Sequence, residues 1–370
     1  MHINIMGVIN KTGFGTHAKN MIKAFDSIDI STAMIPISNV MKSDANELVI
    51  KSLKSKLDID SPYLYLCHDG YLTTQKPKSL IMFQVFETTI LRADTLARID
   101  NYAYSLFTPT LKHKQLLLDN GVTKDIHVVH EGVNPEMFNS NVEDKLIETN
   151  KYTYLLLGKN EARKNTTMVI QGFLNTMKDQ SVALICHTAN HMHSGKDLLK
   201  NWSEIDVEDY GYNKVNETDN YIKFTNGISD IYYSKPVLKD VELKSLYHSA
   251  NVGISYSRGE GWGLPEMEMM ACGVPVIISN VLGHEEYLKD QPVFRTLIVE
   301  PSGYEPADDG VYFNGTAGDW AIMSNVQLES KLLYAYTNTV GMEISKELSE
   351  YYTTNYSWAK AAQQIKEILF

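Results

Sequence analysis

The stretch GEGWGLPEMEMMACGVPVI, residues 259–277, places a glycine turn, a proline and two glutamates before an apolar run. Proline suits the first turn of a helix, because the N–H group that it lacks would be unsatisfied there anyway. The stretch therefore predicts a loop that becomes a helix near Leu264 and Pro265. The free N–H groups of a helix start favour an anion, and a glycine turn lets the backbone come close to a ligand.

Two acids lie on either side of this turn, Glu260 in the loop and Glu268 one turn into the predicted helix. A carboxylate accepts hydrogen bonds from two hydroxyl groups well. We therefore predict that Glu260 accepts from sugar hydroxyls and that Glu268 holds a ribose diol. Glu266 is interpreted as an acid that complements the helix dipole. The loop residues predicted to bind the same ligand are Gly261, Trp262, Gly263 and Leu264.

Strand-like and helix-like runs alternate on both sides of this stretch, which predicts βα units and mainly parallel sheets. The alternation stops at HEGVNPEMFNSNVED, residues 130–144, where glycine and proline mark a turn. The fold class predicted is α/β, with two doubly wound Rossmann-like domains that face each other across a cleft. A polar stretch at 191–226 is predicted to be an insertion with short elements. The predicted strands are 2–8, 63–69, 79–87, 104–110 and 125–132, then 152–160, 181–188, 252–257 and 275–280.

Three cations follow a predicted strand of the second domain. Lys159, Arg163 and Lys164 lie within GKNEARKN, residues 158–165. Ligands of open α/β sheets bind at the carboxyl ends of strands, and lysine and arginine suit phosphate groups there. We therefore predict a phosphate clamp.

The first domain offers weaker candidates at the ends of its predicted strands. Gly13 and Gly15 follow the first strand and would let the backbone approach a donor phosphate or an acceptor, although their spacing is not the dinucleotide fingerprint. His68, Asp69 and Glu87 each end a predicted strand, so we expect them to line the cleft on the acceptor side.

Composition describes a globular protein of 370 residues with a net charge of -11, which argues against a general binder of nucleic acid or membrane surfaces. Three isolated cysteines predict buried thiols in a reducing compartment. There is no signal peptide and no apolar run long enough to span a bilayer, so the predicted location is the cytoplasm. His191 and His193 are interpreted as a solvated loop, and no metal site is predicted.

The quoted motifs resemble those of the family 4 glycosyltransferases (glycosyl transferases group 1), which are retaining enzymes of the GT-B fold. EGWGLPEME, residues 260–268, fits the E-x7-E motif of the family, and MMACGVPVI, residues 269–277, resembles its usual continuation. GKNEARKN resembles the diphosphate clamp, with Lys159 where arginine is usual and Lys164 in the lysine position.

The resemblance extends to both ends of the second domain. VVHEGVNPEMF, residues 128–138, looks like the interdomain hinge. YSWAKAAQQI, residues 356–365, resembles the C-terminal helix that crosses back onto the first domain. The predicted domains are therefore 1–136 together with 352–370, on the acceptor side, and 137–351, which binds the nucleotide sugar.

This resemblance implies that the donor is a nucleotide-diphosphate sugar, UDP- or GDP-linked. It also implies a reaction that requires neither a cofactor nor a metal. It implies that Glu260, Lys164 and Lys159 act in catalysis, with Glu268 and Arg163 in donor binding. Many members carry a histidine in the segment that here reads MFQVFETT, residues 82–89. This chain has Gln84 and Glu87 there, and Glu87 is the candidate for the catalytic residue of the first domain.

Several functions stay open at this point. The candidate acceptors are a glycan, a lipid-linked glycan or another glycoconjugate, a protein, a small molecule and, alternatively, a modified DNA base. The DNA base is considered because many Asn, Lys, Ile and Tyr residues are typical of an AT-rich, viral-type genome, and the location would then be the host cytoplasm. A sugar epimerase or phosphorylase of the same fold is a second enzyme class. A non-catalytic module that binds nucleotide sugars is the alternative outside enzymes.

Overall fold

The computed structural model describes residues 1–41, 44–72, 77–142, 144–188, 204–234, 238–288, 296–310 and 313–370. The chain forms two compact units, which are described separately. The first unit holds Met1–Asn134, Thr316–Gly318 and Thr354–Phe370, and the second holds Pro135–Gly315 and Asp319–Thr353. The sequence analysis placed its boundary after residue 136 and put all of 137–351 in the second domain. The structure differs in assigning the short segment Thr316–Gly318 to the first unit.

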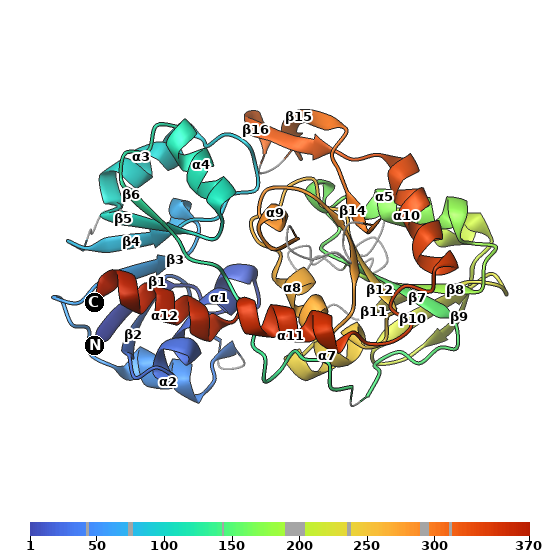
Figure 1. Ribbon diagram of the computed structural model, residues 1–370, viewed down its shortest axis with the longest axis horizontal. Helices are drawn as coiled ribbons and strands as arrows, with labels where there is room; N and C mark the ends of the chain where they lie inside the picture. Colours follow the sequence, from blue (N-terminus) through green and yellow to red (C-terminus); the bar gives the residue numbers. More distant parts are fainter. Residues whose placement is uncertain are drawn as a thin grey trace. The chain divides into compact units, whose positions relative to one another are not determined.

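A parallel sheet forms the centre of the first unit. Over the described ranges it has six strands in the order β2-β1-β3-β4-β5-β6 (Figure 1). The strands are β1 (His2–Gly7), β2 (Ser31–Pro36), β3 (Tyr63–Leu66), β4 (Leu80–Phe83), β5 (Ser105–Thr108) and β6 (Asp125–Val128). The helices are α1 (Gly13–Asp26), α2 (Glu47–Lys54), α3 (Ala93–Tyr102), α4 (Leu111–Asp119) and α12 (Trp358–Leu369).

Two predicted strands of this unit are shorter than expected. β3 ends at Leu66, and β4 ends at Phe83. The predictions that His68 and Asp69 end one strand and that Glu87 ends the other are therefore wrong in detail. These residues lie in the segments that follow the strands, and Asp69 begins a short 3-10 helix, η2 (Asp69–Tyr71).

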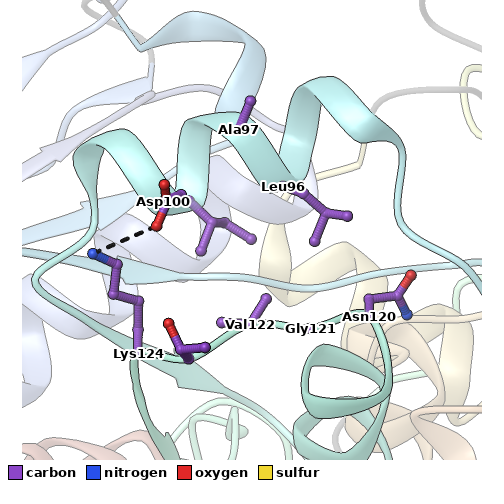
Figure 2. Close-up of a pocket in the computed structure, with 9 residues that line it drawn as sticks. Leu96, Ala97, Asp100, Asn120, Gly121, Val122 and Lys124 are labelled. Carbon is purple, nitrogen blue, oxygen red and sulfur yellow. Dashed lines mark ion pairs between the residues drawn. The ribbon is translucent and has the colours of Figure 1, made fainter.

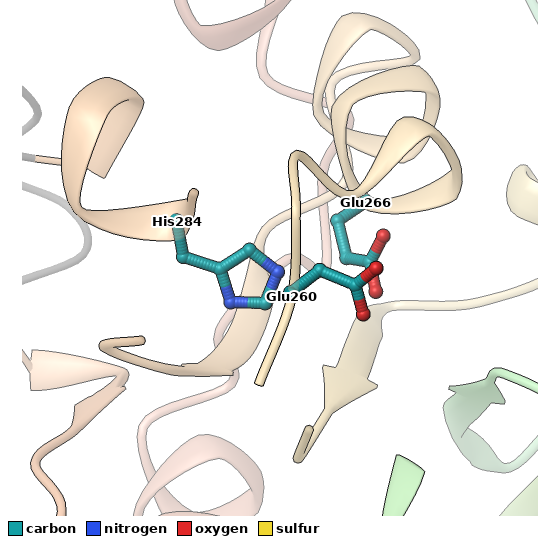
Figure 3. Close-up of side chains that lie close together, drawn as sticks. All are labelled: Glu260, Glu266 and His284. Carbon is teal, nitrogen blue, oxygen red and sulfur yellow. The ribbon is translucent and has the colours of Figure 1, made fainter. Parts of the chain in front are cut away.

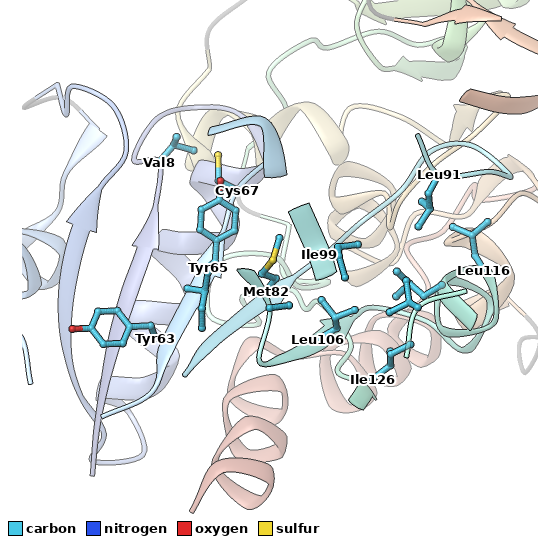
Figure 4. Close-up of a cluster of buried hydrophobic side chains, with 14 residues drawn as sticks. Val8, Tyr63, Tyr65, Cys67, Met82, Leu91, Ile99, Leu106, Leu116 and Ile126 are labelled. Atoms are coloured by element: carbon cyan, nitrogen blue, oxygen red, sulfur yellow. The ribbon is translucent and has the colours of Figure 1, made fainter. Parts of the chain in front are cut away.

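A hydrophobic core joins the sheet of the first unit to α3 and α4 (Figure 4). Every residue of β3, β4 and β5 is buried, as expected for a parallel sheet that is covered on both faces. Burial of this apolar surface is the main favourable term in forming the unit. The cluster includes Tyr65, Met82, Leu106 and Ile126 from the strands and Ile99 and Leu116 from the helices.

The C-terminal helix α12 packs against α1, within the first unit (Figure 1). Just before the helix, Ser357 pairs with Val133 in an isolated parallel bridge. Beside it, His17 Nδ1 lies 2.9 Å from Glu131 Oε1, and both side chains are buried. The ring of Trp358 packs 5.0 Å from the ring of His17. The predicted return of the C-terminal helix to the first domain is confirmed.

A small hollow of about 250 Å³ lies on the first unit between α3 and the segment that follows α4 (Figure 2). Three of its polar side chains, Asp100, Asn120 and Lys124, have partners within the protein. Lys124 Nζ lies 4.0 Å from Asp100 Oδ1, and Asn120 Oδ1 accepts a hydrogen bond from the Leu91 amide at 3.1 Å. None of the predicted site residues lines this hollow.

A second sheet organises the second unit. It has eight strands within the described residues, in the order β14-β13-β12-β7-β8-β11-β10-β9. The strands are β7 (Tyr152–Leu157), β8 (Val182–His187), β9 (Asn213–Glu217), β10 (Tyr221–Thr225), β11 (Asp230–Ser234), β12 (Val252–Ser255), β13 (Val276–Ser279) and β14 (Ile298–Val299), and β15 (Gly303–Asp308) pairs separately with β16 (Asn314–Ile322). The helices are α5 (Thr166–Thr176), α7 (Asp240–Tyr247), α8 (Leu264–Ala271), α9 (His284–Leu288), α10 (Asn325–Thr337) and α11 (Lys346–Asn355).

The stretch predicted as an insertion extends this sheet. β9 pairs with β10, and β10 pairs with β11, as antiparallel strands, whereas β7, β8, β11, β12, β13 and β14 are parallel. His191 and His193 lie outside the described residues. The predicted doubly wound α/β architecture is confirmed in both units.

The strand order of the second unit changes direction between β7 and β12. From β7 the chain continues to β8 on one side and later returns to β12 on the other side. From these two neighbours the chain continues in opposite directions along the sheet, to β8 and to β13. Ligands of open α/β sheets bind at this kind of switch point, so the order of the strands marks the place where a site is expected.

The structure adds two general observations. Cys67, Cys186 and Cys272 are all free and buried, as predicted. Over the described ranges, the helices are all too short or too polar to cross a membrane.

Candidate functional site

Two loops of the second unit meet at the switch point. The loop after β7 ends in a 3-10 helix, η3 (Ala162–Lys164), and the loop after β12 carries Glu260. Lys164 Nζ donates a hydrogen bond to Glu260 Oε2, and the Arg258 amide donates to the Arg163 carbonyl at 2.8 Å. The structure thus brings together two of the predicted clamp residues and the acid predicted to bind a sugar.

Glu260 Oε2 is the centre of this cluster. Besides Lys164, it accepts hydrogen bonds from Arg163 Nη1 and Ser257 Oγ, each at 3.1 Å. Arg163 Nη1 also donates to the Gly259 carbonyl at 2.7 Å, which fixes the guanidinium against the loop. Charge-assisted hydrogen bonds of this kind are the strong ones.

The charges of the cluster follow from its burial and its pairing. Burial raises the pKa of Glu260, but Lys164 and Arg163 outweigh burial and hold that pKa well below its usual value. Burial lowers the pKa of Lys164, but Glu260 and Glu266 outweigh it, so the pKa lies above its usual value. Lys164 and Glu260 are therefore a charged pair at neutral pH.

The third predicted cation differs from Lys164 in its burial. Lys159 is exposed, whereas Lys164, five residues later in the same segment, is buried. An exposed ammonium is screened by solvent and has more freedom than a buried one. The structure therefore distinguishes two lysines that the sequence pattern treated alike.

The helix α8 starts where the sequence predicted, at Leu264, after Gly263 in a left-handed conformation with φ of 91°. Gly261 and Trp262 are buried and Leu264 is half-buried. Glu266 lies in the first turn of α8, as the dipole interpretation requires, but its tertiary contacts were not predicted. Its side chain is completely buried and accepts a hydrogen bond from Ser255 Oγ.

A third loop brings a histidine to the cluster (Figure 3). The Gly283 amide donates to the Glu260 carbonyl at 2.9 Å. A Cβ atom at Gly283 would lie 2.1 Å from the Gly261 carbonyl oxygen, so this close approach requires glycine. His284 follows directly and is completely buried beside Glu260 and Glu266.

Glu260, Glu266 and His284 each offer one ligand atom, and these atoms lie within 4.8 Å of one another. Such a group has the composition of a metal site. However, the cation that contacts it here is the Lys164 ammonium, which lies 3.9 Å from Glu266 Oε1 and is bonded to Glu260. A divalent ion among these groups would be repelled by Lys164 and Arg163, and this repulsion is strong where water is excluded.

The second acid of the E-x7-E pattern has a different environment. Glu268 Oε2 accepts a hydrogen bond from the buried Tyr247 hydroxyl of α7 at 2.9 Å. Burial raises the pKa of Glu268 to about 8, although the hydrogen bond from Tyr247 opposes this rise. Glu260 is therefore charged at neutral pH, whereas Glu268 holds a proton.

The raised pKa of Glu268 predicts a pH-dependent stability. From the usual pKa of 4.5 up to about 8, the unfolded chain has released this proton while the folded protein still holds it. Stability therefore falls as pH rises through this window. Glu268→Gln removes the titration, so its melting temperature relative to wild type should increase between pH 5 and pH 9. Thermal unfolding at several pH values measures this, and a difference that stays constant across the window contradicts the assignment.

The candidates of the first unit have partners of their own. Asp69 is buried, and its Oδ2 accepts from Arg98 Nη1 at 2.8 Å. His68 Nδ1 accepts from the Gly70 amide at 3.0 Å, and burial lowers the pKa of this histidine. These two residues are brought together, but Asp69 is committed to an ion pair.

The glycine candidates of the first unit differ from each other. Gly13 is exposed at the start of α1, with open space where a side chain would lie. At Gly15 a Cβ atom would meet Asn10 Oδ1 at 2.3 Å, so the close approach of Asn10 requires glycine at this position. Glu87 is half-buried in the segment after β4.

Comparison with known proteins is consistent with this geometry. Residues 216–307 match the family model described as Glycosyl transferases group 1. A D-inositol 3-phosphate glycosyltransferase of Paenarthrobacter aurescens is 35% identical over 82 residues, which are 22% of this chain and 19% of that protein. The chain therefore matches about a fifth of the length of this curated relative.

Solved structures share the fold over the whole chain. Sucrose-phosphate synthase of Thermosynechococcus elongatus has a TM-score of 0.67 at 13% identity and covers 100% of this chain and 98% of its own. Anabaena HepE in complex with UDP-glucose has a TM-score of 0.62 at 12% identity, with 100% and 99% covered. At such low identity the likeness concerns the fold. Residues 216–307 are therefore similar to the glycosyl transferases group 1, and the chain as a whole has the GT-B fold of two Rossmann-like domains.

Proposed function

We propose that this protein is a retaining glycosyltransferase that moves a sugar from a nucleotide-diphosphate sugar to an acceptor hydroxyl. The observation that carries the proposal is the buried group of Lys164, Arg163 and Glu260 at the switch point of the second unit. It offers two cations for a diphosphate and one ionised carboxylate for sugar hydroxyls. The family match and the named relatives support this activity.

In this proposal the site acts by electrostatic stabilisation. The bond between the anomeric carbon and the diphosphate breaks, a bond to the acceptor oxygen forms, and the hydroxyl proton leaves with the diphosphate. Negative charge develops on the leaving diphosphate as the sugar acquires oxocarbenium character. Lys164 and Arg163, placed in advance, would stabilise that charge without reorganisation in the transition state.

The donor is proposed to be UDP- or GDP-linked, because HepE, which shares the fold, is described with UDP-glucose. The acceptor is proposed to be a glycan or a glycoconjugate. The test is a panel of nucleotide sugars incubated with acceptor mixtures, followed by mass spectrometry and by NMR of the new anomeric centre. Transfer with unchanged anomeric configuration supports the proposal. Binding of nucleotide sugars without transfer or hydrolysis would favour a binding module instead.

Metal independence is part of the proposal. Because Lys164 and Arg163 occupy the place beside Glu260 and Glu266, the diphosphate needs no divalent ion for charge compensation. Activity should therefore survive EDTA, measured as the initial rate before and after dialysis against the chelator. Complete loss that manganese restores would show that this account of the diphosphate site is wrong.

A further inference from the structure

Glu266 is the least accessible carboxylate of the site. Its exposed fraction is 0%, compared with 8% for Glu260 and for Lys164. It projects from α8 beneath the loop that carries Glu260, and its Oε1 accepts from Ser255 Oγ and lies 3.9 Å from Lys164 Nζ. A side chain so deeply buried cannot contact a substrate, so it acts on the reaction only through its neighbours.

The other oxygen of Glu266, Oε2, lies near an imidazole nitrogen and a phenol hydroxyl rather than near a second cation. An ideal Cβ atom at Gly263 would lie 2.9 Å from each of Glu266 Oε2, His284 Nε2 and the Tyr287 hydroxyl, so these atoms surround one point. His284 Nδ1 lies 2.8 Å from the Ser279 carbonyl, which only accepts, so Nδ1 carries the proton and Nε2 is an acceptor in the neutral ring. Burial lowers the pKa of His284, so this ring is uncharged and does not compensate Glu266.

Lys164 is therefore the cation that compensates Glu266. The charged and titratable groups that face Lys164 are Glu260 on the loop after β12, Glu266 on α8, Arg163 on η3 and His284 on α9. When Glu260 accepts hydrogen bonds from a donor sugar, its carboxylate interacts with the ligand as well as with the Lys164 ammonium, so its interaction with Lys164 weakens. Glu266 remains anchored by Ser255 and keeps its place.

We propose that Glu266 is a positioning residue for Lys164, a fixed buried carboxylate that keeps the ammonium charged and in place when Lys164 turns from Glu260 to the diphosphate of the donor. This inference rests on the proposed function, because it assigns Lys164 to the diphosphate. It explains why an acid lies at a completely buried position of a helix that otherwise packs methionines, since Met267, Met269 and Met270 are all 0% exposed.

The test compares wild type with Glu266→Gln, which keeps the shape of the side chain and removes its charge. The matched control is Glu300→Gln, which removes one exposed acid of the same unit. Titration of the Lys164 side-chain signal by NMR, assigned with Lys164→Ala, measures the pKa directly. In Glu266→Gln the titration midpoint of Lys164 should fall by about one pH unit, a tenfold change in its acid dissociation constant. In Glu300→Gln the Lys164 midpoint should stay as in wild type.

Calorimetry with UDP and with GDP between pH 6 and pH 10 measures the consequence for binding. The loss of nucleotide affinity at alkaline pH should begin about one unit lower in Glu266→Gln. If Glu266→Gln does not fold, Glu266→Asp takes its place, because it keeps the charge but withdraws it by one methylene and should shift both midpoints less.

The two proposals fail in different ways. Wild type that binds neither UDP nor GDP overturns the proposed function, and with it the part of this inference that concerns the diphosphate. Normal nucleotide binding with the same Lys164 midpoint and the same pH profile in wild type and Glu266→Gln overturns the positioning role alone.

Discussion

Lys164→Ala should lower the turnover number by about 10²- to 10³-fold, because a preorganised charge in a dry site is worth this much when it stabilises a transition state. Lys164 is buried, charged and bonded to Glu260, so no mobile solvent cation replaces it easily. The free nucleotide diphosphate should also bind more weakly. Initial rates at saturating donor and calorimetry with the nucleotide measure the two effects.

The control for this substitution is an exposed lysine of the same unit. Lys145→Ala removes an equal charge from an exposed position, where solvent screening makes its contribution small. Its turnover should therefore stay within a few-fold of wild type. Circular dichroism and thermal unfolding of Lys164→Ala separate a catalytic loss from unfolding. A folded Lys164→Ala with wild-type turnover and nucleotide affinity would remove Lys164 from the site.

The strand pattern and the glycine and proline signals are sufficient to predict the fold and the start of α8. Strands β7, β8, β12 and β13 lie inside the predicted runs, because their apolar residues form continuous stretches that only a buried parallel strand explains. The ends of β3 and β4 were less predictable. Apolar residues continue past Leu66 and Phe83, so the pattern does not show where the pairing stops.

Glu266 shows why the site was predicted only in part. An acid in the first turn of a helix has the same sequence pattern whether it faces solvent or the protein interior. The outcome depends on Ser255 and Lys164, which come from other segments of the chain. His284 belongs to no motif, and its place depends on the close contact between Gly283 and Gly261. Tyr247 lies on α7, far from Glu268 along the chain, and its hydrogen bond to Glu268 is a tertiary contact.

The two glutamates of the E-x7-E pattern should fail in different ways when they are changed. Glu268→Ala should weaken the free nucleotide and the nucleotide sugar alike, because both carry the ribose that Glu268 is predicted to hold. Removing an acceptor from a buried hydrogen bond typically costs about 1–3 kcal/mol, so a loss of about tenfold or more in both affinities is expected. Calorimetry at pH 8.5 measures these affinities, because the pKa of Glu268 is about 8 and the carboxylate form is then available.

Replacing Glu260 should affect the nucleotide sugar but not the free nucleotide, since Glu260 is predicted to contact the sugar. Its replacement needs care, because alanine would leave Lys164 and Arg163 without their shared carboxylate, and breaking a buried pair in this way costs about 3–5 kcal/mol. Glu260→Gln removes the charge but keeps the shape and one acceptor oxygen, and is the better variant. It should spare the affinity for free nucleotide diphosphate while lowering turnover by about 10²-fold, the loss typical for one group that stabilises a transition state.

The comparison of the two variants decides between two accounts of the loop. If Glu260→Gln loses the free nucleotide as severely as Glu268→Ala, then Glu260 acts on the diphosphate through Lys164 and Arg163 rather than on the sugar. The sugar contacts would then come from other groups. If only the nucleotide sugar and turnover suffer, the carboxylate that holds Lys164 in the structure is also the one that receives the sugar. One buried charge would then link donor recognition to stabilisation of the leaving diphosphate.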